Sequence, residues 1–244
     1  DIFNFKYFTG PNPYLNTGAY VFDFALTGNQ EPLPTGDYLD VIGDRYPHLK
    51  ESTYDTPAHL FARTVAEVGK LDMDLHFTHW AVTTCPKDCL RIAVECIHVR
   101  TTRAVVFAVW DWFEAITQDR NFWIEDQIEV IQEVFRQSVY GGPTVYALLK
   151  TAQAQGIPTF YLWDEGLMQY GYGSKHVRGI ATTFDGDSHI DSDFTTQKDD
   201  CKAFLGTMGV PVPQRRIVYT VADALEAAEP VGYPVAVKPV VGHK

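Results

Sequence analysis

Two lysines in the last quarter of the sequence are the residues best suited to chemistry. Lys238 ends an apolar, β-branched run and is followed by Pro239 and Gly242, and Lys198 opens an earlier helical pattern. A strand would fix the stem of Lys238, Pro239 would end the ladder, and Gly242 would let the backbone approach an anion. Together the lysines predict two ammonium groups beside nucleotide phosphates. Taken alone, a lysine at a strand end is more often a solvated edge charge.

The elements that must position these lysines follow a regular order. A helix is predicted from Lys198, and a Gly-Val-Pro-Val-Pro turn follows it at 209–213. We then expect a short strand (216–220), a helix (220–229) that Thr220 caps, and a buried strand (234–238) that ends at the second lysine.

The preceding segment predicts a helix packed on a sheet. A helix at 144–155, a Gly-Ile-Pro turn and a strand at 159–163 follow one another closely, and an amphipathic strand is predicted at 177–184. Helix, turn and strand in quick succession are typical of α/β structure.

Residues 1–139 are predicted to form one α+β domain. Aromatic and aliphatic residues alternate in a half-buried strand at 18–26, and Thr56 with Pro57 predicts a helix start. The remaining predicted elements are a strand at 75–80, a hairpin with arms at 89–99 and 104–112, and an amphipathic helix at 124–139.

Composition excludes several classes of protein. The 244 residues suffice for one large domain or two ordinary ones, and the net charge of −11 argues against an unspecific nucleic-acid or anionic-membrane surface. It is compatible with cationic, arginine-bearing partners. Since neither an apolar run long enough to span a bilayer nor a secretory leader is evident, we expect a cytoplasmic protein without membrane contact.

The four cysteines give no complete metal-ligand pattern. Cys85 and Cys89 are spaced like two metal ligands, but neither a second cysteine pair nor a suitably spaced histidine pair accompanies them. We therefore expect reduced cytosolic thiols.

The order of the two lysines around the proline-rich turn resembles that of ATP-grasp ligases. The runs GGPTVYALLKTAQAQGIP (141–158) and QYGYGSKHVRGIATTFDGDS (169–188) further resemble cyanophycin synthetases, which polymerise aspartate with arginine on its side-chain carboxylate. The resemblance is strong over 141–244 and fainter over 1–140. It implies an α+β accessory domain (1–139), a linker and start of the central domain (140–197), and the first part of an α/β ATP-grasp domain (198–244).

The resemblance also implies roles for individual residues. Lys198 and Lys238 would neutralise ATP phosphates, and a loop of Gly242, His243 and Lys244 would fold over them. This loop departs from the Asn-His-Gly sequence often found in the family. ATP and Mg²⁺ are the implied cofactors, but no residue is assigned as catalytic or as a metal ligand.

Two further residues are candidates for substrate binding. Thr144 stands where the family has a serine, and its hydroxyl could hold the terminal carboxylate of the growing chain. Asp193 stands where the family has an acidic residue before the first lysine. The alternatives are equally simple: Thr144 caps a helix, and Asp193 is a solvated loop residue.

A departure in the first domain favours one type of enzyme. Some family members carry two histidines four residues apart on a helix of this domain, and these can hold a metal and hydrolyse the polymer. Here Arg63 stands four residues after His59, in place of the second histidine. A cation beside the histidine disfavours a metal. With the Gly-Pro-Asn-Pro-Tyr-Leu start of the chain, this favours the second type of cyanophycin synthetase, which joins β-aspartyl-arginine dipeptides.

The implied partners are the cyanophycin polymer, the β-Asp-Arg dipeptide and further copies of the chain in a dimer or tetramer. Alternatives are the first type of synthetase, which adds aspartate and arginine in turn, another ATP-grasp ligase, or a non-catalytic scaffold. We expect the chain alone to be inactive, because the family's Mg²⁺ ligands and adenine pocket lie beyond Lys244.

Overall fold

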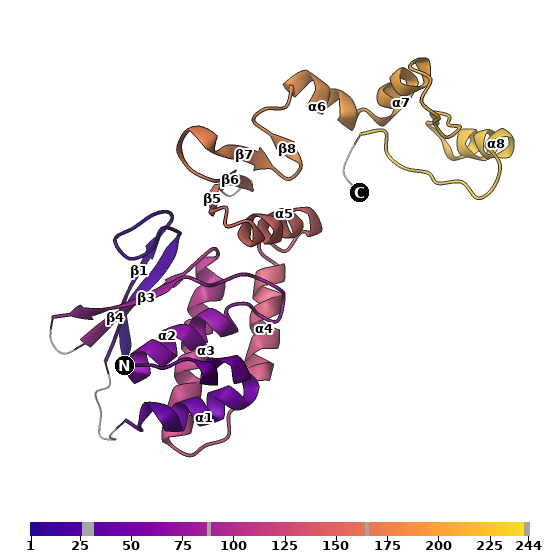
Figure 1. The fold of residues 1–244 in the computed structure, drawn as a ribbon. Coiled ribbons are helices and arrows are strands. Elements are labelled where there is room, and N and C mark those ends of the chain that lie inside the picture. The colour runs from indigo at the N-terminus through magenta and orange to yellow at the C-terminus, as the bar shows by residue number, and fades with distance from the viewer. Residues whose placement is uncertain (26–31, 87–88, 164–165, 242–244) are drawn as a thin grey trace. The chain divides into compact units, whose positions relative to one another are not determined.

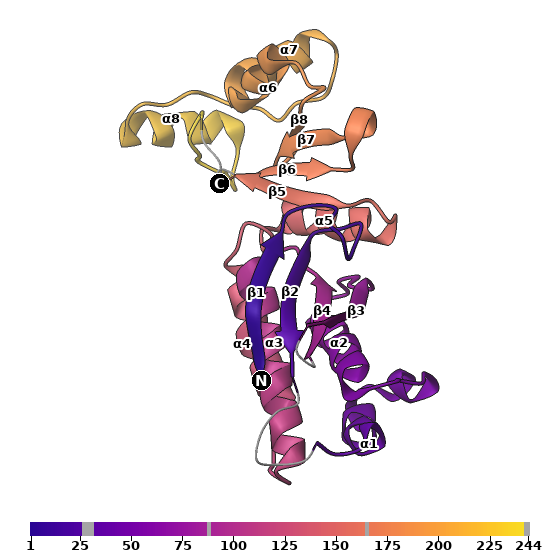
Figure 2. The same ribbon diagram turned by 90° about the vertical axis from the view of Figure 1, so that its left-hand side faces the viewer.

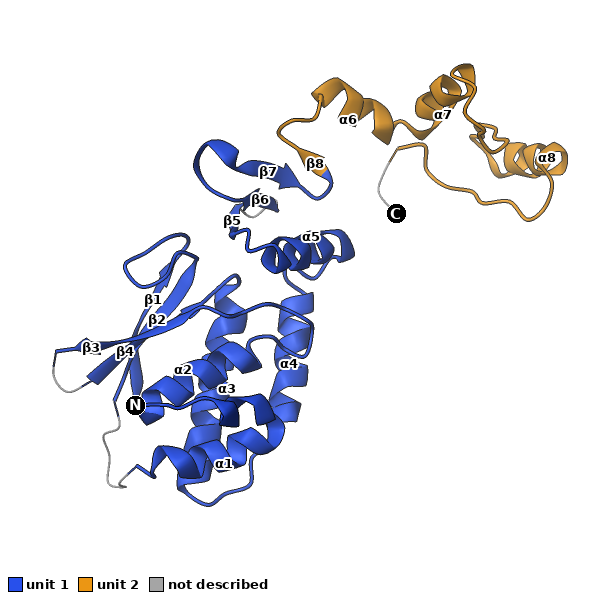
Figure 3. Cartoon of the chain, viewed as in Figure 1, with its two compact units in different colours: residues 1–182 blue, residues 183–244 orange. Residues whose placement is uncertain are grey.

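The computed structural model describes residues 1–25, 32–86, 89–163 and 166–241. Mixed α and β structure is divided between two compact units, Asp1–Thr182 and Thr183–Lys244 (Figure 3). The domain boundaries predicted at 139 and 197 stay predictions. Among the helices described, none has the length and apolar character needed to cross a membrane.

The first unit is built on an antiparallel sheet. Its strands are β1 (Ile2–Phe8), β2 (Ala19–Phe24), β3 (Trp80–Cys85) and β4 (Cys89–Glu95), in the spatial order β1-β2-β4-β3. The strand predicted at 18–26 is confirmed as β2, but all six of its residues are buried instead of alternating. The reason is that Leu15, before β2, packs with Val21 and Ala93 on the face opposite the main core.

Helices cover the other face of this sheet (Figures 1 and 2). They are α1 (Thr35–Arg45), α2 (Pro57–Val68), α3 (Val99–Thr117) and α4 (Ile124–Arg136), with a short 3₁₀ helix, η1 (Pro47–Glu51), between the first two. α2 lies against β3 and β4, and α4 packs on α3. The aromatic rings of Phe22, Phe61 and Phe113 meet edge to face in the core, with centroids 6.1 and 5.1 Å apart.

One of the two arms of the predicted hairpin is wrong. Its first arm is β4, but the second arm is the middle of α3. Residues of α3 such as Val105, Val109 and Trp112 are typical of strands, yet their spacing also places them on one buried helix face. Packing of that face on the core outweighs the strand preference of the individual residues.

The strand predicted at 75–80 is also wrong, because the chain is irregular until β3 begins at Trp80. This segment is held by contacts to distant helices instead of by strand pairing. Gln132 of α4 donates a 2.6 Å hydrogen bond to the carbonyl of Leu71, and Gln153 accepts one of 3.2 Å from the backbone N–H of His76.

The first unit also contains a second antiparallel sheet. It follows α5 (Pro143–Ala154) and includes β5 (Thr159–Trp163), β6 (Leu167–Tyr170) and β7 (Val177–Ile180), with a 3₁₀ turn, η2 (Gly173–Lys175), before β7. Tyr140 anchors this region, since its ring stacks on Phe135 and its hydroxyl donates to the carbonyl of Ile97 over 3.1 Å. The strand predicted at 177–184 is shorter, because the chain turns at Ala181 with φ 52°.

The second unit is mainly helical over its described residues. After β8 (Thr183–Phe184) it contains α6 (His189–Thr196), α7 (Lys198–Thr207) and α8 (Val221–Val231). Thr220 caps α8 as predicted, in a reciprocal capping box with Asp223. The strands predicted at 216–220 and 234–238 are wrong: both segments are irregular, and no described strand pairs with either. The ATP-grasp fold stays a prediction.

A buried ion pair joins β2 to β4. Both carboxylate oxygens of Asp23 accept hydrogen bonds from the Arg91 guanidinium, at 2.7 and 3.0 Å. The amide of Asn4 donates a third bond of 2.8 Å, and Asp23 is only 4% exposed. The hydrogen bond from Arg91 holds the pKa of Asp23 below its usual value, against the opposing effect of burial.

Breaking this pair should destabilise the first unit strongly. We expect Arg91→Met to lower the free energy of unfolding by about 3–5 kcal/mol, because it leaves a buried carboxylate without its cation. Urea unfolding at pH 7 measures this loss. The double variant with Asp23→Asn should recover part of it, and a loss below about 1 kcal/mol would match an exposed pair instead.

Acid should remove the same stabilisation. Because the folded pKa of Asp23 lies below its unfolded value, its contribution is complete above the unfolded pKa and is lost as the pH falls through the folded pKa. Unfolding curves between about pH 5 and 2 should therefore be shallower in pH for Asp23→Asn than for the parent chain. Equal pH slopes would contradict the assignment.

Candidate functional site

A cleft in the second unit brings together the two predicted lysines. Its volume is about 630 Å³, within the range of small-molecule sites. The walls come from the start of α7, the segment 213–218, α8, and the segment 231–240. Both Lys198 and Lys238 line it, so the residues whose spacing predicted a phosphate site share one cavity.

Lys198 joins two walls of the cleft. It is the first residue of α7. Its backbone N–H and its Nζ both donate to the carbonyl oxygen of Val240, each over 3.3 Å. The segment that carries Lys238 is therefore fixed to the beginning of the helix that carries Lys198.

Lys238 reaches the cleft in a different way from the one predicted. It lies in an irregular segment, and its side chain is exposed. Over the described part of the chain no carboxylate pairs with it. The contact between Val240 and Lys198 positions this segment, instead of the strand ladder that the sequence predicted.

A second link across the cleft is an ion pair that sequence reasoning missed. Arg215 donates from Nε to the Asp199 carboxylate, and each side chain is about three-quarters buried. This pair ties the segment after the proline-rich turn to the first turn of α7. The only sequence signal was the Arg215-Arg216 dipeptide directly after that turn.

The cleft is cationic although the chain is acidic. Its lining residues include one carboxylate, which Arg215 already neutralises, and these cationic side chains: Lys198, Lys202, Arg215, Arg216 and Lys238. Such a lining fits the phosphates of ATP. It does not fit Mg²⁺, because Asp199 is the sole acidic residue among the described residues of the lining and is engaged with a guanidinium.

The two substrate-binding candidates lie in different units. Thr144 is the second residue of α5, and the N-cap position belongs to Gly142, so the capping alternative for Thr144 is wrong. Asp193 lies on α6 and not in a loop. Both side chains are exposed, and their roles in substrate binding stay predictions. Gly242, His243 and Lys244, predicted to cover the phosphates, lie outside the described residues.

The helix around His59 has local contacts. His59 lies on α2, and its Nδ1 is 2.9 Å from the hydroxyl of Thr56, the residue predicted to cap the helix. Arg63 is 3.3 Å from the carboxylate of Glu67, one turn further on. The cation next to His59 therefore belongs to an ion pair along the helix surface.

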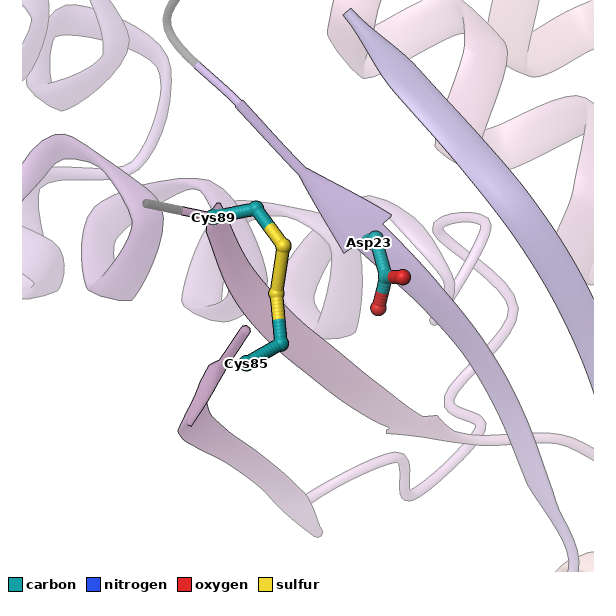
Figure 4. A group of neighbouring side chains, drawn as sticks. All are labelled: Asp23, Cys85 and Cys89. Atoms are coloured by element: carbon teal, nitrogen blue, oxygen red, sulfur yellow. A yellow bond between two sulfur atoms is a disulfide. The ribbon is translucent and has the colours of Figure 1, made fainter. Parts of the chain in front are cut away.

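A group of possible metal ligands occurs where β3 ends and β4 begins. One donor atom each of Asp23, Cys85 and Cys89 lies within 4.8 Å of the others (Figure 4). The two sulfurs, however, form a disulfide, and the Asp23 carboxylate is bound by Arg91 and Asn4. These donors do not fit a metal ion. The prediction of reduced thiols is wrong for this pair, because the antiparallel register places Cys85 directly opposite Cys89.

Comparison with known proteins identifies relatives for part of the chain. No protein-family model matches it. It is 34% identical over 121 residues to cyanophycin synthetases of Trichormus variabilis and of Nostoc sp., which is 49% of this chain and 13% of each relative. The cyanophycin synthetase of Geminocystis herdmanii is 30% identical over 103 residues, 42% of this chain and 12% of that protein. The match thus spans a small part of the relatives' length.

Thiol labelling tests the cysteine arrangement. Without reductant, we expect iodoacetamide to modify the partly exposed Cys201 and to spare the disulfide of Cys85 and Cys89. Cys96 should also be spared, because it is 3% exposed and burial raises the pKa of its thiol to about 12. Peptide mass spectrometry measures this. Labelling of Cys85 and Cys89 before reduction would contradict the disulfide, and labelling in urea is the control.

Proposed function

We propose that this chain, which is similar to cyanophycin synthetases over about half of its length, is part of an ATP-dependent ligase that forms amide bonds in cyanophycin synthesis. The observation that carries the proposal is the shared cleft of Lys198 and Lys238. The proposed product follows from the relatives, which are cyanophycin synthetases. Each line of support is independent, since one rests on geometry and the other on sequence identity.

The proposed chemistry needs fixed cations. A carboxylate does not react with an amine at neutral pH, and ATP, when bound, supplies the phosphoryl group that activates it as an acyl phosphate. The task of Lys198 and Lys238 is to hold the phosphates and to offset the charge that develops during transfer. The Mg²⁺ that such a reaction uses is not assigned to residues of this cleft.

The finer proposal concerns the substrate. We assign the chain to the second type of synthetase, which joins β-Asp-Arg dipeptides to the cyanophycin polymer as a homo-oligomer. Arg63 next to His59 favours this type, because a paired cation in that place disfavours the hydrolytic metal site of other members. Thr144 and Asp193 are the proposed substrate contacts.

Nucleotide binding tests the role of the lysines. Lys238→Ala should weaken ATP binding to the full-length protein by roughly 10- to 100-fold, because a charge-assisted hydrogen bond contributes about 1.5–3 kcal/mol. Isothermal titration calorimetry of the parent and the variant measures the change. Lys175→Ala, at an exposed lysine of the first unit, is the matched control. A full-length parent protein that binds no ATP would favour the non-catalytic scaffold.

Substrate-dependent phosphate release tests the type of enzyme. With the full-length protein, ATP and a cyanophycin primer, we expect β-Asp-Arg to stimulate phosphate release well above the rate with free aspartate plus arginine. The opposite order of rates would assign the chain to the first type. No stimulation by either substrate set would contradict a role in cyanophycin synthesis.

A further inference from the structure

A third ammonium group belongs to the cleft. Lys202 lies four residues after Lys198 on α7, and residues at this spacing share one face of a helix. Both line the cavity. Lys202 is partly buried, and no carboxylate of the described chain pairs with it. Its charge is therefore available next to that of Lys198.

The cleft has cationic charge beyond what the two predicted lysines supply. Asp199 neutralises Arg215, so the latter adds no net charge. A phosphate monoester carries ~1.5–2 negative charges at neutral pH, and a triphosphate carries more. Besides these two lysines the lining holds Arg216, and the ammonium of Lys202 adds a further positive charge on the helix face of Lys198.

We propose that Lys202 is a phosphate-positioning residue that makes the cleft select a triphosphate over shorter phosphates. Its ammonium holds the phosphate chain beside Lys198, one helical turn further along α7. This inference rests on the proposed function, because it assumes that the anion in the cleft is that of ATP. It goes further in naming the residue by which the site distinguishes ligands of different charge.

Calorimetric titration of the full-length protein with inorganic triphosphate, inorganic phosphate and ATP tests the proposal. Lys202→Ala should weaken binding of triphosphate and ATP about 10-fold and leave that of inorganic phosphate within a factor of about two, since a single phosphate does not need the ammonium of Lys202. The difference should shrink at high salt, because counterions screen partly exposed charges. Lys202→Arg should keep most of the affinity, and Lys175→Ala should bind like the parent.

Folding of the variants is checked independently. Alanine and arginine are both good helix formers, so α7 should persist, and far-UV circular dichroism with urea unfolding verifies this. Should Lys202→Ala unfold the second unit, Lys202→Gln, which keeps most of the side-chain length without the charge, serves in its place.

The possible results distinguish a failure of the proposed function from a failure of the role of Lys202. Absence of ATP and triphosphate binding by the full-length parent protein would overturn the proposed function. If the parent binds and Lys238→Ala weakens it, while Lys202→Ala behaves like Lys175→Ala, only the role of Lys202 is overturned. An equal loss for phosphate and triphosphate would also overturn it, because the residue would then lack the proposed selectivity.

Discussion

One carbonyl oxygen, that of Val240, holds the candidate site together. It accepts hydrogen bonds from both the backbone and the side chain of Lys198. The segment of Lys238 has no strand partner among the described residues, so this contact fixes it to α7. The ion pair of Asp199 with Arg215 does the same for the segment after the proline-rich turn. Two helices and two irregular segments thus line the cavity, and no described strand contributes to it.

Local patterns predicted most helices of the chain correctly. Thr56 with Pro57 marked the start of α2, Thr220 marked α8, and the apolar spacing after Ile124 marked α4. These signals lie within a few residues of the element they define. They fix where a helix begins and which face is buried, and they need no information about distant parts of the chain.

The predictions that were wrong or incomplete all concern features that depend on contacts between distant parts of the chain. A strand exists only through hydrogen bonds to a neighbour, and no short-range pattern shows whether the neighbour is present; 216–220 and 234–238 lack one among the described residues. α3 was misread because β-branched residues suit a buried helix face as well as a strand. In the site, the spacing of the lysines predicted their proximity, but the pairing of Asp199 with Arg215 depends on tertiary structure.

The position of Tyr140 bears on how the first unit unfolds. Its ring stacks on Phe135 of α4 and meets the ring of Tyr161 of β5 edge to face, which connects the helical layer to the second sheet. Leu149 and Met168 belong to the same apolar core as Phe22. The small sheet therefore has no independent interior. We therefore expect the small sheet to unfold together with the large one, as one cooperative unit.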